Sequence, residues 1–252
     1  MKEEFIGDLK YIDPRKLITE NNSNDVENFF LVLSCIFNDL KGILLFETML
    51  IEKYKKPEDE ERNVHSGNYY GTLVYINKLM LSTINEFIIF LQKNINVFDD
   101  PEFKIILSKL PKTQSKYWND MISYISDEKM NSNNFLKTII KIRSNIGFHF
   151  DHSGTQLRKG YISRFFGQTT DLGSQLAYYS IGENIATTRF FFADAATSEY
   201  LSLAANKTFK EDSFNNKRTL DFYKETIEII KIIFNITYVL LKYYMPYRRN
   251  QS

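Results

Sequence analysis

The chain has very little cysteine, glycine or proline for its length. It contains 1 cysteine, 10 glycines and 5 prolines in 252 residues. A single cysteine, Cys35, excludes an intramolecular disulfide and a zinc site built from several cysteines. Its apolar neighbours predict a buried, unreactive thiol. Scarce glycine and proline disfavour an all-β fold, because such folds need many tight turns.

Long hydrophobic runs and a strong charge of one sign are also missing. The most apolar stretch, 229–241, contains Lys231 and Asn235 and is shorter than the ~20 residues that a membrane span needs. Residues 1–10 include acidic side chains and no apolar core, which predicts no secretory signal. The net charge of +1 provides no general attraction to a polyanion. We therefore expect a cytoplasmic protein with no membrane partner.

Helical periodicity is the dominant pattern in what remains. Apolar residues recur every three or four positions in the segments 26–44, 73–91 and 220–244, as on one face of a helix. Asn24 before the first segment is typical of a helix N-cap. The polar stretch 53–68, which contains one of the histidines, predicts a loop between the first two helices.

Shorter elements are predicted between the long helices. Asp100 followed by Pro101 predicts the start of a short helix that Pro111 closes. Two further helices are predicted over 115–126 and from Asn133 through the IRSNIGFHF stretch.

These patterns predict an all-α, up-down helical bundle that forms a single domain over 1–252. The bundle helices are assigned to 24–152 and 213–245, with Pro246 ending the last one, and 153–212 is an insertion of uncertain structure. Within the insertion, 176–192 is rich in aromatic and β-branched residues and fits either a short hairpin or a buried helix.

The stretch from Lys141 to His152 holds two of the three histidines in the chain. Asn145 and His149 are four positions apart, so they share one helix face, and His152 follows that face three positions later. Arg143 lies about 120° away on a straight helix, but its side chain is long. An arginine and a histidine together suit phosphate chemistry, because histidine transfers protons near neutral pH and arginine stabilises charge on phosphate oxygens.

The surroundings of this stretch are basic, although the chain as a whole is nearly neutral. Between 137 and 168 the sequence has six basic residues and one acidic residue. The basic residues are Lys137, Lys141, Arg143, Arg158, Lys159 and Arg164, and the acidic residue is Asp151. This asymmetry fits a phosphate-bearing partner. On the charge alone, a solvated basic face is the favoured explanation.

The segment IRSNIGFHFD resembles the signature of HEPN domains, helical proteins of prokaryotic toxin–antitoxin, abortive-infection and RNA-processing systems. That signature is an arginine, usually followed by a polar residue, and then a histidine after four to six residues. Arg143 and His149 are separated by five residues. Ser144 departs from the asparagine or aspartate that is more usual after the arginine. Asn145 follows one place later and keeps the four-residue spacing to His149.

The resemblance implies a metal-independent endoribonuclease, a toxin or phage-defence effector without a cofactor, whose products carry 2′,3′-cyclic phosphate and 5′-hydroxyl ends. It implies a homodimer whose two motifs form one RNA-binding cleft, and an antitoxin or nucleotidyltransferase as partner. Arg143, His149 and Asn145 would be catalytic. Substrate contacts would come from Ser144, Lys141, His152, Arg158 and Lys159.

Three alternatives compete with this interpretation. The first is a non-catalytic HEPN-like module that binds a nucleotide, RNA or protein. The second is a structural role, with Arg143 paired to a carboxylate and His149 partly buried. The third is a metal site at His149, Asp151 and His152, which is disfavoured because near neighbours on a helix rarely share one ion and zinc needs three or four ligands.

Overall fold

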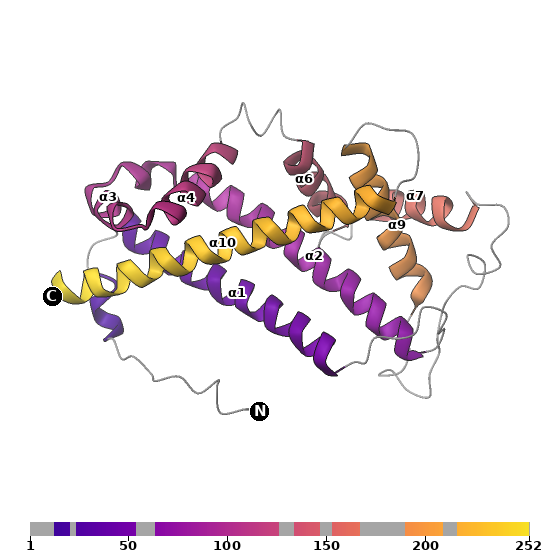
Figure 1. The fold of residues 1–252 in the computed structure, drawn as a ribbon, viewed down its shortest axis with the longest axis horizontal. Coiled ribbons are helices and arrows are strands. Elements are labelled where there is room, and N and C mark those ends of the chain that lie inside the picture. Colours follow the sequence, from indigo (N-terminus) through magenta and orange to yellow (C-terminus); the bar gives the residue numbers. More distant parts are fainter. Residues whose placement is uncertain are drawn as a thin grey trace.

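The structure, a computed structural model, describes residues 13–20, 24–53, 64–125, 134–146, 153–166, 190–208 and 216–251. Within these ranges the secondary structure consists of eight α-helices and two short 3-10 helices, with no strand. The predicted all-α helical bundle is therefore confirmed (Figure 1).

Three long helices form the body of the bundle. They are α1 (Asp25–Lys53), α2 (Val64–Lys93) and α10 (Asn216–Gln251). In Figure 1 α10 runs diagonally across α1 and α2, and it contacts both. The apolar periodicity explains this packing, because residues such as Leu40 and Ile233 point into the shared core and are fully buried.

Short helices cover the end of the bundle where α1 begins. They are η2 (Pro14–Lys16), η3 (Ile95–Asp99), α3 (Pro101–Ser108) and α4 (Lys112–Tyr124). Aromatic rings fill the space between these helices, α1 and α10. The rings of Phe29, Phe30, Phe98, Phe103, Trp118 and Tyr244 form a continuous series of contacts.

Three helices gather at the opposite end (Figure 1). They are α6 (Asn134–Ile146), α7 (Ser153–Phe166) and α9 (Phe191–Thr208). The described parts of the predicted insertion are thus mostly helical. Of the segment 176–192, for which a hairpin or a helix was predicted, only the last three residues are described, and α9 begins within them.

The predicted helix starts at Asn24 and Asp100 are confirmed. Asn24 Oδ1 accepts hydrogen bonds from the backbone N–H of Val26 at 2.8 Å and of Glu27 at 3.3 Å. Asp100 Oδ1 accepts from Glu102 N–H at 2.8 Å, with proline at the first helical position. Both side chains satisfy backbone donors that the first turn leaves without partners.

The prediction that Pro246 ends the last helix is wrong, because α10 continues through it to Gln251. A proline removes one hydrogen bond from a helix, and here the remaining turn is held by tertiary contacts. Arg248 contacts the backbone oxygen of Lys16 at 3.4 Å and a carboxylate oxygen of Glu102 at 3.5 Å. It also donates a short hydrogen bond to Glu27.

This Arg248 cluster is largely buried. The side chains of Glu27, Arg248 and Glu102 are 1%, 13% and 15% exposed. Glu27 also accepts hydrogen bonds from Thr19, at 2.7 Å from N–H and 2.8 Å from the hydroxyl. Burial raises the pKa of Glu102, against the opposing effect of Arg248. The cluster therefore ties the N-terminal segment, α1, α3 and the end of α10 together.

Two further predictions about single residues are wrong. His65 and Gly67 lie inside the first turns of α2 rather than in a loop. Cys35 is exposed rather than buried, because it lies on the face of α1 opposite Leu40, which points into the core.

The expectation that the chain lacks apolar stretches long enough to cross a membrane is wrong on length and composition. Two of the described helical segments, Asp25–Glu52 and His65–Lys93, are long and apolar enough. Here α1 and α2 pack against each other and against α10. Their core residues include Leu33 and Ile84, which are fully buried.

Candidate functional site

Arg143 lies near the end of α6, at the border between its buried and exposed faces. Leu136, Ile139 and Ile142 recur at three-residue steps and are at most 1% exposed, so they fix how α6 sits on the bundle. The helix contacts α2, α7 and α9. As a consequence the Arg143 side chain is directed toward α2 and remains 32% exposed.

The guanidinium of Arg143 is held by Glu86 of α2. Glu86 Oε1 accepts from Arg143 Nε at 3.1 Å and from Nη2 at 2.8 Å. Glu86 is 54% exposed, so this ion pair faces solvent. An arginine carries five N–H donors, and three of those on Arg143 have no partner among the described residues. They are the donors with which a bound phosphate could pair.

The ion pair lines a groove of about 250 Å³ between α1, α2 and α6. The other lining residues are Ile36 and Asp39 of α1 and Leu79, Ser82 and Thr83 of α2. The groove thus has an apolar floor, two hydroxyls, two carboxylates and one guanidinium. An incoming phosphate must either use the remaining Arg143 donors or displace Glu86, since like charges repel.

The other predicted site residues are placed unevenly. Ser144 and Asn145 lie in the last turn of α6, where only their backbone is described. His149 and His152 lie outside the described residues. The structure therefore places Arg143 in a groove and leaves its relation to His149 a prediction.

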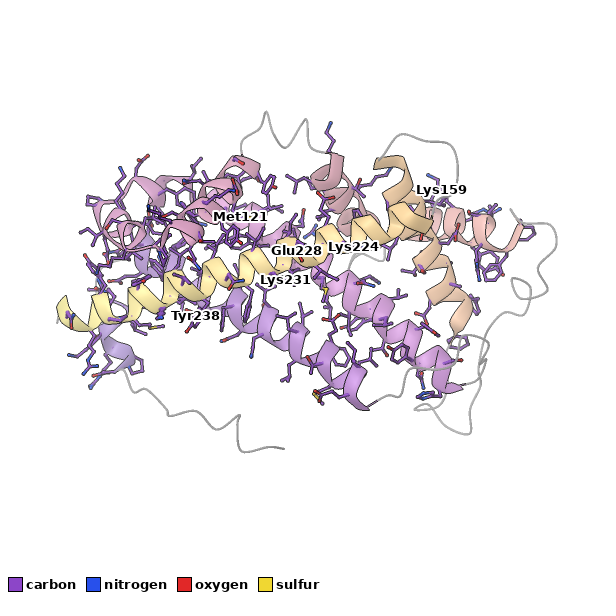
Figure 2. All side chains as sticks on the ribbon, viewed as in Figure 1. Met121, Lys159, Lys224, Glu228, Lys231 and Tyr238 are labelled. Atoms are coloured by element: carbon purple, nitrogen blue, oxygen red, sulfur yellow. The ribbon has the colours of Figure 1, made fainter. Side chains whose placement is uncertain are left out.

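The predicted basic contacts lie on two helices at the same end of the bundle. Lys141 is exposed on α6, and Arg158 and Lys159 are exposed on α7. Figure 2 shows Lys159 on α7, next to α9. None of the three lines the Arg143 groove, so any part they take in binding lies beyond its edge.

Sequence reasoning missed Glu86 and Asp39 as members of this site. Glu86 is 57 positions before Arg143, and nothing in the local pattern of α2 marks it. The one usable signal is that Glu86 interrupts an apolar series, since Phe87 and Ile88 directly after it are buried.

A second groove, of about 280 Å³, lies between α1, α2 and α9 and includes Phe46, Tyr75, Lys78 and Asp194. Burial lowers the pKa of Lys78, and the nearby carboxylate of Asp194 acts in the opposite direction. No residue of the predicted motif lines this groove, so the Arg143 groove is the stronger candidate for the phosphate chemistry.

No protein family, curated protein or solved structure matches this chain. The features of the chain that bear on function are therefore Arg143, its groove and the sequence around it.

Proposed function

We propose that the chain is a metal-independent endoribonuclease of the HEPN type, acting as a toxin or phage-defence effector. The observation that carries the proposal is the position of Arg143. Its guanidinium is part exposed at a groove, with three N–H donors that have no partner among the described residues. The spacing from Arg143 to His149 and the resemblance of IRSNIGFHFD to the HEPN signature support the same conclusion.

The proposed reaction uses the 2′-hydroxyl of the RNA as the nucleophile. His149 accepts the 2′-hydroxyl proton as the 2′-oxygen attacks phosphorus, or donates a proton to the 5′-oxygen as the P–O5′ bond breaks. Arg143 donates hydrogen bonds to the non-bridging oxygens, where negative charge develops. Asn145 orients His149. The products are a 2′,3′-cyclic phosphate and a 5′-hydroxyl end.

The proposal includes a homodimer in which the two Arg143–His149 motifs face one cleft. In that arrangement one protomer's histidine accepts the proton while its partner's donates one. Light scattering at micromolar concentration is expected to give twice the mass of the 29.8 kDa chain. A monomer under these conditions would contradict the two-motif cleft.

Cleavage rates of single variants test the proposal. With RNA in EDTA, His149→Ala should slow cleavage ~100-fold or more. Arg143→Ala should have a similar effect, because one preorganised donor contributes roughly 3 kcal/mol to the transition state. The double variant should be little slower than the slower single variant, since the two groups act together. His65→Ala, on α2 and outside the groove, is the control and should cleave normally.

Glu86→Gln separates substrate binding from chemistry. The amide keeps an acceptor for Arg143 but removes the negative charge that competes with phosphate. KM should therefore fall while kcat changes only a few-fold. A large loss of kcat with unchanged KM would show that Glu86 has another part in the reaction.

The Arg143–Glu86 ion pair itself favours a second candidate, a non-catalytic helical module that binds RNA, a nucleotide or a protein. In that case the ion pair joins α6 to α2, and no RNA is cleaved in the groove. The two candidates differ in one outcome. The non-catalytic module would leave RNA intact in the assay above but would still bind a ligand.

A further inference from the structure

Five aromatic side chains form a continuous strip where α7 packs against α9. They are Tyr161, Phe165 and Phe166 of α7 together with Phe190 and Phe192 at the start of α9. The Tyr161 ring is at the centre of the strip, 4.6 Å from Phe165 and 6.4 Å from both Phe166 and Phe192. The strip continues from Phe192 to Phe190 at 6.0 Å.

Much of this aromatic strip faces solvent. Phe166 and Phe190 are 75% and 55% exposed, and Tyr161 and Phe192 are 39% and 38% exposed. Rings at such exposure contribute little to the core, and a contiguous exposed apolar patch of this kind marks an interaction surface. Below the strip the two helices are in close contact, because Gly160 lies against the backbone of Ala196 and Tyr200. The rings are therefore carried by two closely packed helices.

The charged side chains of α7 all have one sign. Helix α7 carries Arg158, Lys159 and Arg164 and no acidic residue. Within the described part of the chain, neither Arg158 nor Arg164 has an ion-pair partner. Of the two acidic residues of α9, Glu199 accepts a hydrogen bond from Ser163 of α7 at 2.7 Å, and Asp194 lines the groove of Lys78.

Rings and cations alternate along one face of α7. Arg158 is three residues before Tyr161 and four before Ile162, and Arg164 is three residues after Tyr161, so each arginine neighbours the strip. A helix that lies on a membrane keeps its charges and its apolar side chains on opposite faces. The alternation on α7 instead matches a single strand of nucleic acid, whose bases stack on aromatic rings and whose phosphates pair with arginine.

We infer that this aromatic strip, with Arg158 and Arg164, is a binding platform for single-stranded RNA. The inference rests on the proposed function, because it names unpaired RNA as the substrate that approaches the Arg143 groove from α7. The strip lies on the same end of the bundle as α6, which contacts both α7 and α9. A duplex does not fit, since its bases are already stacked and cannot reach the rings.

Binding to an uncleavable strand tests the platform separately from catalysis. The probe is a fluorescent 2′-deoxy oligonucleotide of mixed sequence, measured by anisotropy with the full chain. The double variant Tyr161→Leu/Phe192→Leu keeps apolar volume but removes two rings. It should raise Kd at least about fivefold, because stacking of one base contributes at least ~1 kcal/mol and that energy corresponds to this fold-change. Tyr161→Phe should bind as the wild type does. Tyr238→Ala removes a ring that is 50% exposed on α10, far from α7 in Figure 2, and should also leave Kd unchanged.

Electrostatics give a second readout. Arg158→Gln should reduce the dependence of log Kd on log salt by about 0.7, the value for one phosphate contact of a single strand. A double variant that binds like the wild type, or a duplex of the same sequence that binds as tightly as the single strand, would overturn the platform. So would ring-dependent binding to vesicles of anionic lipid without binding to the strand.

The outcomes distinguish this inference from the proposed function. If the ring variants lose binding but the wild-type chain does not cleave RNA, the platform is supported and the nuclease is refuted. If the wild-type chain cleaves RNA and the ring variants bind the strand as tightly and have the same KM, the platform is refuted and the proposed nuclease is supported.

Discussion

Replacing Arg248 with methionine should destabilise the bundle by several kcal/mol, because it leaves the Glu27 carboxylate buried without a cation. The Glu27 side chain is 1% exposed, and among the described residues the donors that remain to it are the N–H and hydroxyl of Thr19. Removing one partner of a buried ion pair typically costs about 3–5 kcal/mol. A chain of this size is expected to have a total stability of about 5–15 kcal/mol, so the loss is a large fraction of it.

The matched control is an ion pair on the same helix that faces solvent. Lys231 and Glu228 are 2.8 Å apart and 60% and 65% exposed, and both are labelled on α10 in Figure 2. Lys231→Met should cost at most ~1 kcal/mol, as exposed pairs do. Urea unfolding followed by circular dichroism measures both variants. Glutamine carries no charge, so adding Glu27→Gln to Arg248→Met should recover part of the lost stability.

An Arg248→Met variant as stable as Lys231→Met would refute this reasoning. It would mean that water reaches Glu27, or that the end of α10 contributes little to the stability of the bundle.

Two further predictions concern stability. Gly160→Ala should lower the free energy of unfolding by about 1–3 kcal/mol in a urea titration, because its Cβ would lie 2.1 Å from the Ala196 backbone oxygen. The control Gly42→Ala has nothing within 4 Å of its Cβ and should stabilise α1 by roughly 1 kcal/mol. Equal effects of the two substitutions would contradict the packing of α7 on α9. Burial raises the pKa of Glu47 above its ordinary 4.5, so its folded form binds a proton more tightly and stability falls as the pH rises past that value. The free energy of unfolding of Glu47→Gln should fall less steeply over this pH range, and an unchanged slope would exclude Glu47 as the cause.

The long helices could be predicted because their signals are local. The apolar residues of α1 recur at helical spacing, and Asn24 and Asp100 satisfy backbone donors only two or three positions away. The end of α10 could not be predicted in this way. Pro246 is a local stop signal, and it is outweighed by contacts of Arg248 with residues more than 100 positions away.

For the candidate site, the sequence could point to Arg143 but not to the residues that surround its side chain. The motif identified Arg143 from its spacing to His149, and the structure places its guanidinium at a groove. Its partner Glu86 comes from another helix, so only the packing of α6 on α2 brings the two together. The aromatic strip likewise depends on α7 meeting α9, which no periodicity within either helix encodes.

The chemistry of the RNA ends is the decisive measurement for the proposed nuclease. Products formed by the wild-type chain in EDTA should carry 2′,3′-cyclic phosphates and 5′-hydroxyls, because in the proposed reaction the 2′-oxygen is the nucleophile and His149 and Arg143 act without a metal. The same products should be almost missing for His149→Ala and Arg143→Ala. Ends with 3′-hydroxyls and 5′-phosphates, or RNA that the wild type leaves intact, would contradict the proposed reaction.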